Sequence, residues 1–211
     1  MTELSYVNGV SHQTLLGETI GNFFDAACER WESRPALVVR HQKVRLSYGE
    51  LRAEVDKLAA GLLALGLEPG DRIGIWSPNN SEWVLTQFAT AKAGLILVNI
   101  NPSYRTAELE YALNKVGCKA LILAERFKTS DYVGMLRELA PELGQAEPGR
   151  LEAARLPALR SVVLLGEGWH PGTFRFAEIL ARGTAKEAQR IAELAVVLDT
   201  MTSDVFSTVK G

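Results

Sequence analysis

The stretch DRIGIWSPNNSEWVLTQFATAKAGLILVNI, residues 71–100, contains a complete strand–helix–strand unit. Residues 72–76 and 95–100 are short, mostly apolar runs, and residues 81–92 between them hold neither Gly nor Pro. Gly94 is a natural stop for the intervening helix. Because strands covered by helices on both faces of a parallel sheet read as continuous apolar runs, this unit predicts two buried, parallel strands.

The same alternation continues after residue 100. We expect further strands at 119–124 and 161–165, and further helices at 106–116, 131–139, 174–181 and 184–198, with a polar loop at 144–155. Alternating strands and helices predict an α/β fold with a Rossmann-like, mostly parallel sheet and helices on both faces. The longest uncharged apolar run, 93–100, is far shorter than the ~20 residues that a membrane-spanning helix needs.

An N-terminal elaboration precedes this sheet. Thr19 is placed to cap a helix with one apolar face, and two short strands at 36–39 and 44–48 predict a hairpin. The apolar face of the helix comprises Ile20, Phe23, Phe24, Ala27 and Trp31. Ser47 and Glu50 form a capping-box pattern at the start of the next helix, which Gly66 ends. We therefore divide the chain into a lead-in (1–46), an α/β subdomain (47–198) and a divergent tail (199–211).

Composition excludes several classes of protein. The chain has 211 residues, of which 47% are hydrophobic, as in ordinary globular domains. Lys and Arg number 23 against 25 Asp and Glu, so the net charge of −2 argues against a nucleic-acid partner. Cys28 and Cys118 are too few and too far apart for a disulfide framework or a zinc site, and reduced thiols predict a cytoplasmic protein. Residues 1–9 lack the features of a secretion signal.

Familiar catalytic motifs do not account for the sequence. It contains neither a P-loop nor a G-x-S-x-G nucleophile elbow. The run GEGWHPG, 166–172, follows a strand as a dinucleotide-binding loop would, but Pro171 occupies the position of the third glycine, so we interpret this run as a surface loop. Ser77 to Asn80 are interpreted as the cap of the next helix, and the scattered histidines His12, His41 and His170 as solvated side chains.

The candidate binding residues follow the strand at 95–100. Ligands of open α/β sheets gather at the carboxyl ends of the strands, which is where the segment NINPSYR, 99–105, lies. Tyr104 offers an aromatic face and Arg105 offers a guanidinium suited to phosphate. In the competing interpretation, Tyr104 packs under the next helix and Arg105 pairs with Glu108 or Glu110.

Several stretches in the same order resemble a known family. These are residues 15–42, LSYGEL (46–51), 61–83, TQFATAKAGLILVNINPSYRTAELEYAL (86–113) and LPALRSVVLLG (156–166). Together they resemble the N-terminal part of the AMP-forming acyl-CoA synthetases of the adenylate-forming superfamily, and residues 99–113 are most similar to the medium-chain fatty-acid branch.

The resemblance implies a two-step reaction. A fatty acid would attack the α-phosphate of ATP with Mg²⁺, giving an acyl-adenylate and pyrophosphate, and the thiol of CoA would then form the thioester. The cofactors implied are ATP, Mg²⁺ and CoA, and the fold implied is the family's first subdomain. Arg105 becomes the candidate for the phosphates of CoA, with Tyr104 beside it.

The end of the sequence departs from the family pattern. A Ser/Thr/Gly-rich phosphate loop ending in Pro-Lys-Gly should follow soon after Leu198, but residues 204–211 read DVFSTVKG. We therefore expect a fragment of a fatty-acid–CoA ligase that cannot adenylate by itself, because a loop without glycines cannot bring several amides onto a triphosphate. The alternative is a non-catalytic module that binds a nucleotide or CoA or self-associates as a homodimer. An unrelated nucleotide-binding α/β protein would need glycines at residues 77–80, where there are none.

Overall fold

The computed structural model describes residues 16–208, with side chains described up to Leu198. Its helices are α1 (Ile20–Arg30), α2 (Tyr48–Ala64), α3 (Ser81–Lys92), α4 (Thr106–Val116), α5 (Tyr132–Leu139), α6 (Phe176–Leu180) and α7 (Ala185–Thr208). Its strands are β1 (Pro35–Val39), β2 (Val44–Ser47), β3 (Arg72–Trp76), β4 (Ile96–Asn99), β5 (Ala120–Ala124), β6 (Arg126–Phe127), β7 (Ser130–Asp131), β8 (Ser161–Leu165) and β9 (Phe174–Arg175). Among the described residues, none of the helices is long and apolar enough to cross a membrane.

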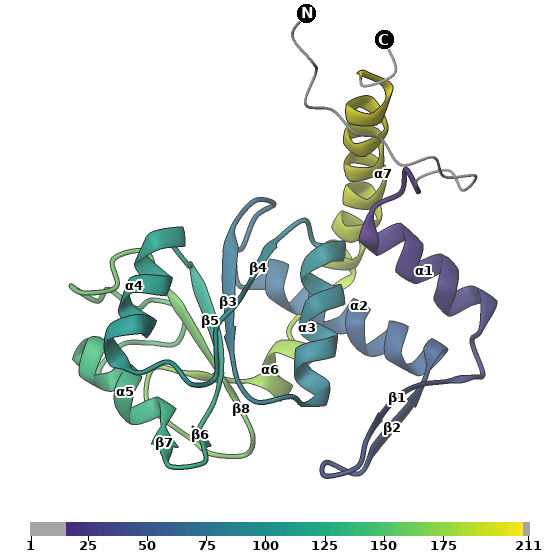
Figure 1. Cartoon of the computed structure of the whole chain (residues 1–211). Coiled ribbons are helices and arrows are strands. Elements are labelled where there is room, and N and C mark those ends of the chain that lie inside the picture. The colour runs from purple at the N-terminus through teal and green to yellow at the C-terminus, as the bar shows by residue number, and fades with distance from the viewer. Residues whose placement is uncertain (1–15, 209–211) are drawn as a thin grey trace, which may run out of the picture.

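Five parallel strands form the central sheet in the order β4-β3-β5-β8-β9, which confirms the predicted α/β fold. Helices α4 and α5 cover one face, and α2, α3 and α6 cover the other (Figure 1). Successive side chains of a strand point to opposite faces, so β5 contributes Ile122 to the core under α2 and α3, and Leu121 and Leu123 to the core under α4 and α5. The strands predicted at 72–76 and 161–165 have these bounds in the structure.

The prediction of a buried strand at 95–100 is wrong in one respect. Strand β4 lies at the edge of the sheet and pairs with β3 alone, and Ile96 is 51% exposed. An apolar run indicates a strand, but it does not say how many neighbours the strand has. Leu95 and Ile100, which flank β4, are buried and hold it against the body.

The lead-in folds as predicted but is less buried than predicted. Thr19 caps α1, Ser47 and Glu50 form both bonds of the capping box, and β1 and β2 pair as an antiparallel hairpin. Within α1, however, only Phe24 of the predicted apolar face is buried, whereas Ile20 and Phe23 are 60% and 51% exposed. Helical spacing identifies an apolar face, but the inward side of α1 is formed by Phe24 with Gly21 and Cys28.

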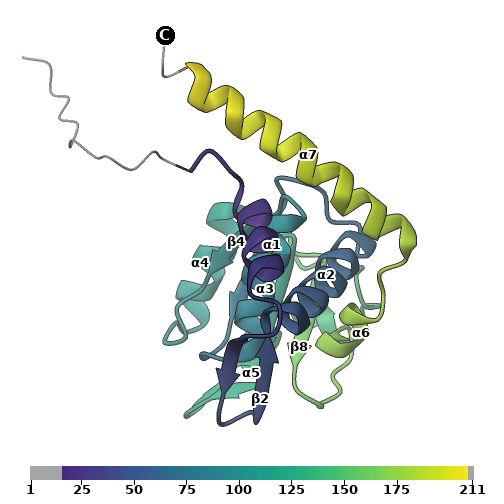
Figure 2. The same cartoon turned by 90° about the vertical axis from the view of Figure 1, so that its right-hand side faces the viewer.

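The C-terminal half contains elements that the sequence did not predict. Phe174 and Arg175 form strand β9 beside β8, where a helix was predicted, and β6 and β7 form a small hairpin. The loop predicted to be polar at 144–155 buries Leu151 and Ala153 in the core. Helix α7 runs past the predicted end at residue 198 and extends away from the body (Figure 2). The predicted tail, 199–211, has no described side chains.

Candidate functional site

The carboxyl ends of β3, β4 and β5 meet at one edge of the sheet, where binding residues were predicted. Strand β3 continues into Ser77, and β4 continues into the loop 100–105 that leads to α4. The backbone N–H of Ile100 donates to the carbonyl of Ile75 at 3.0 Å, so the loop leaves the sheet in register with β3. The sheet topology therefore places the segment containing Tyr104 and Arg105 at the ligand-binding edge.

Two buried aromatic side chains hold this loop in place. The rings of Trp76 and Tyr132 stack with centroids 3.7 Å apart, and both side chains are fully buried. Trp76 Nε1 donates to the carbonyl of Asn101 at 3.1 Å, and the hydroxyl of Tyr132 donates to the carbonyl of Pro102 at 2.5 Å. Sequence reasoning missed this pair. A Trp at the end of an apolar strand could have pointed to it, because the polar atoms of buried Trp and Tyr side chains need hydrogen-bond partners, and the loop carbonyls supply them here.

Arg105 lies at the N-terminus of α4 with its side chain in solvent. Its backbone N–H donates to Glu108 Oε2 at 3.0 Å, and Glu110 binds Arg155 instead, at 2.6 and 2.9 Å. Within the described part of the chain, the Arg105 guanidinium forms no ion pair. Burial raises the pKa of the Tyr132 hydroxyl, and the nearby positive charge of Arg105 partly opposes this shift.

Tyr104 packs against the core beneath α4 and α5 and is only partly exposed. This position matches the interpretation in which its ring packs under the following helix. Its backbone N–H donates to the carbonyl of Asn101 at 3.0 Å, which tightens the turn. At the carboxyl ends of the strands, the ring of Tyr104 is therefore packed in place, whereas the guanidinium of Arg105 is exposed and forms no ion pair within the described residues.

The turn from Ser77 to Asn80 is a helix cap, as predicted. Asn80 Oδ1 accepts a hydrogen bond from the backbone N–H of Trp83 at 2.9 Å, and Asn80 Nδ2 donates to Ser77 Oγ at 3.0 Å. The backbone N–H of Ser81 donates to Gln42 Oε1 at 2.7 Å, which ties the lead-in hairpin to the start of α3. These contacts satisfy the first turn of α3 without a ligand.

The loop 166–172 packs closely on the carboxyl end of β5. A Cβ atom at Gly168 would lie 1.6 Å from Glu125 Oε1, so a side chain there would displace the Glu125 carboxylate. His170, predicted to be solvated, is instead a partly buried side chain between two charged groups. Its Nδ1 lies 3.3 Å from Arg137 Nη2 and its Nε2 lies 3.9 Å from Glu125 Oε1.

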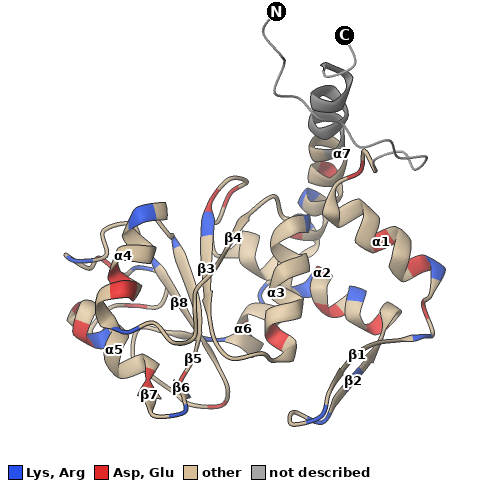
Figure 3. Cartoon of the chain, viewed as in Figure 1, with Lys and Arg blue, Asp and Glu red and all other residues tan. Residues whose placement is uncertain are grey.

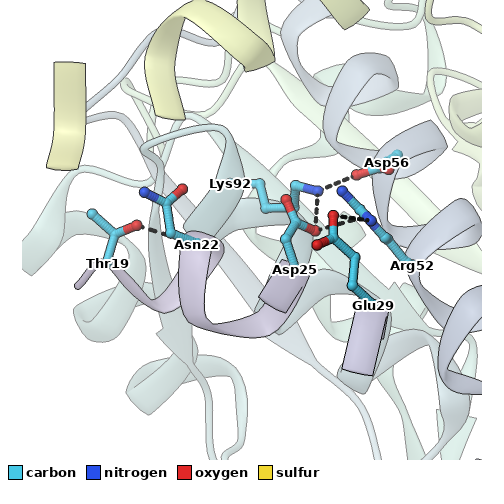
Figure 4. Close-up of polar contacts among 7 residues, drawn as sticks. All are labelled: Thr19, Asn22, Asp25, Glu29, Arg52, Asp56 and Lys92. Carbon is cyan, nitrogen blue, oxygen red and sulfur yellow. Dashed lines mark hydrogen bonds and ion pairs between the residues drawn. The ribbon is translucent and has the colours of Figure 1, made fainter. Parts of the chain in front are cut away.

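A second cluster of charges lies between α1, α2 and α3 (Figure 4). Lys92, whose side chain is only 6% exposed, donates to Asp25 at 2.7 Å and also binds Asp56. Arg52 lies 3.1 Å from the same Asp25 carboxylate and 3.0 Å from Glu29. Each charge has a partner of opposite sign, so the network joins the three helices and offers no free group for catalysis.

Basic and acidic residues are interspersed along the helices and strands (Figure 3). At the carboxyl ends of the strands, Arg105 and Arg126 both present exposed guanidinium groups that form no ion pair within the described residues. The sequence pattern of the AMP-binding enzymes matches residues 24–154. This match covers more than half of the chain, and the chain belongs to that family.

Curated relatives give the same result. The chain is 47% identical over 184 residues to the mitochondrial medium-chain acyl-CoA ligase ACSF2 of Pongo abelii. The alignment covers 87% of this chain and 30% of that protein. It is 34% identical over 170 residues to the putative acyl-CoA synthetase YngI of Bacillus subtilis, covering 80% and 31%. The chain thus spans about a third of the length of these relatives.

Solved structures share the fold. The acetoacetyl-CoA synthetase of Streptomyces lividans superposes with a TM-score of 0.65 at 26% identity, covering 79% of this chain and 25% of that one. The anthranilate CoA ligase AuaEII, in complex with anthranoyl-AMP, also gives a TM-score of 0.65, at 20% identity, covering 78% and 28%. The second likeness, at this identity, supports the fold alone.

Proposed function

We propose that this chain forms the sheet scaffold of an AMP-forming ligase that joins a medium-chain fatty acid to CoA. The observation that carries the proposal is the 47% identity to a medium-chain acyl-CoA ligase along 87% of the chain. The substrates are then a fatty acid, ATP with Mg²⁺, and CoA. When bound, ATP would supply the activated α-phosphate to which the fatty-acid carboxylate becomes attached.

Arg105 is our candidate contact for a phosphate of CoA. Its guanidinium is exposed, unpaired within the described residues, and adjacent to the N-terminus of the eleven-residue helix α4, where the helix dipole favours anions. The backbone N–H of Arg105 already binds Glu108, so the side chain is the group offered to a ligand. The stacked pair of Trp76 and Tyr132 fixes the loop and lowers the entropy cost of binding there.

We assign no described residue to ATP or Mg²⁺. Residues 204–211, where the resemblance leads us to expect the phosphate loop, lie outside the residues whose side chains are described. Because the match spans only 30% of the ligase that the chain resembles, we propose that the 211-residue chain by itself binds CoA but does not adenylate fatty acids. Burial of both free thiols, Cys28 and Cys118, is compatible with the reducing cytoplasm that we propose as its location. Immunofluorescence of the intact protein would test that location, and a mitochondrial signal would contradict it.

Titration calorimetry with CoA tests the role of Arg105. We expect Arg105→Ala to weaken binding about tenfold, as loss of one charge-assisted contact would. Arg126→Ala is the matched control, because Arg126 is also exposed and also follows a strand end of the same edge. Dephospho-CoA lacks the 3′-phosphate, so comparing its affinity with that of CoA tells whether Arg105 contacts the 3′-phosphate or the pyrophosphate. Equal affinities for Arg105→Ala and the unmodified chain would remove Arg105 from the site.

Pyrophosphate exchange with C6–C12 fatty acids tests the catalytic part of the proposal. The 211-residue chain should give no exchange above a control without protein. Robust exchange that depends on the fatty acid would refute our view that the adenylating residues lie elsewhere. The two assays are independent, so a failure of CoA binding leaves the result on adenylation intact.

A further inference from the structure

Helix α1 presents an apolar ridge beside an apolar groove. Ile20 and Phe23 lie one turn apart on one face of α1, and Leu16 lies just before the helix; the three side chains are 60%, 51% and 63% exposed. The groove has a volume of about 430 Å³, and its walls include Phe24, Tyr48, Leu51, Val84 and Phe88. In Figure 2, α1 lies on the side of the molecule that faces the viewer. Exposed apolar residues gathered in this way mark an interaction surface.

The walls of the groove are part of the hydrophobic core. Phe24 stacks on Phe88 with ring centroids 4.2 Å apart, and both residues belong to the hydrophobic cluster beneath α2 and α3. The ion pairs of Lys92 and Arg52 link α1, α2 and α3, the helices that supply most of the walls of the groove. A ridge and a groove that are both preformed can dock with little ordering cost.

We propose that this surface binds a second copy of the chain through an antiparallel contact between the two α1 helices. A ridge next to a groove on one surface is self-complementary: under a two-fold axis, the ridge of each copy enters the groove of the other. With the axis near Phe23 and Phe24, Ile20 of one copy inserts between Phe24, Ala27 and Trp31 of the other.

The charges at the two ends of α1 favour this orientation. Glu18 lies at the N-terminal end of the groove, and Arg30 lies in the last turn of α1. The Arg30 guanidinium is held 5.4 Å from the centre of the Trp31 ring. Antiparallel docking brings each Glu18 to the Arg30 of the other copy, giving two ion pairs, and it also opposes the two helix dipoles. A parallel contact would place like charges together.

Sedimentation equilibrium of the whole chain over a range from low micromolar to about 200 μM tests the proposal. We expect a monomer–dimer equilibrium, which Phe23→Glu weakens at least about a hundredfold because it buries two carboxylates near the axis. Tyr111→Glu is the matched control: Tyr111 is 68% exposed on α4, on the other face of the sheet, and its substitution should leave the dimer unchanged. Circular dichroism establishes that both variants are folded.

Charge reversal tests the register. Glu18→Arg alone and Arg30→Glu alone should each weaken the dimer about tenfold, because each loses two ion pairs, and the double variant should restore it. A chain that stays monomeric at 200 μM, or a dimer insensitive to Phe23→Glu, would overturn the proposal. Failure of the double variant to recover would overturn the antiparallel register. Flotation of the monomer with neutral phosphatidylcholine vesicles would instead assign the ridge to a lipid surface.

Discussion

Removing Lys92 should cost less stability than removing the two carboxylates that bind it. Lys92 is the most buried charge of its network: its side chain is 6% exposed, against 23% for Asp25 and 45% for Asp56. Lys92→Met deletes the ammonium and keeps an apolar stem, while Asp25 keeps Arg52 at 3.1 Å and Asp56 remains half in water. Because replacing a buried ion by an apolar isostere is often nearly neutral, we expect a loss of about 1 kcal/mol in the free energy of unfolding.

The double variant Asp25→Asn/Asp56→Asn leaves the ammonium buried without a carboxylate. Stranding a buried charge typically costs about 3–5 kcal/mol, and we expect a loss of about 3 kcal/mol because the asparagine oxygens still accept hydrogen bonds. Adding Lys92→Met to this double variant removes the stranded charge. The triple variant should therefore be about 2 kcal/mol more stable than the double variant.

Urea unfolding at pH 7, followed by the fluorescence of the four tryptophans, measures these differences. Lys57→Met is the control, because Lys57 is 56% exposed and, among the described residues, pairs only with Glu54 at 2.7 Å. Its loss should stay within about 0.5 kcal/mol. If Lys92→Met proves more costly than the double variant, burial of the ammonium is not what governs this network, and the reasoning fails.

Three further outcomes follow from buried groups. Tyr132→Phe should lower the free energy of unfolding by about 1–1.5 kcal/mol in urea titrations, because the carbonyl of Pro102 loses its donor; an unchanged value would show that the bond is dispensable. Burial alone would raise the pKa of Asp71, but hydrogen bonds from Lys119 and a backbone N–H lower it below its usual value of about 3.9. Asp71 therefore stabilises the fold above about pH 4 and loses this effect as the pH falls through its lowered pKa, so Asp71→Asn should flatten the acid limb of a stability–pH profile. Burial raises the pKa of the Cys118 thiol to about 11, so a thiol reagent at pH 8 should label it only after unfolding; fast labelling of the native chain would contradict its burial.

The elements that the sequence predicted well are those with local signals at both ends. Helix α3 has a capping Asn80 before it and Gly94 after it, and its bounds agree with the prediction. Helix α2 has the Ser47 capping box and ends before Gly66, whose φ of +82° suits glycine. In these segments local chemistry and the apolar period point to the same structure, so neighbouring residues were enough.

The elements that the sequence missed depend on distant partners. Strand β9 is only two residues long, and it exists because Phe174 and Arg175 pair with β8. The contact between Trp76 and Tyr132, which fixes the candidate site, joins a strand to a helix that begins well after it in the chain. Apolar spacing in α1 could not show that Phe23 would be left uncovered, because burial depends on what packs against a face.

The two proposed surfaces are separated by the sheet and its covering helices. Arg105 lies at the N-terminus of α4, on the face covered by α4 and α5, whereas the ridge of α1 lies beyond α2 and α3 on the other face (Figure 1). Contact between two α1 helices would therefore leave the carboxyl edge of each sheet open to CoA. Coupling between the surfaces would have to pass through the sheet or through the Lys92 network, in which each charge already has a partner of opposite sign. Since coupling requires an element with two arrangements, we expect dimer formation and CoA binding to be independent.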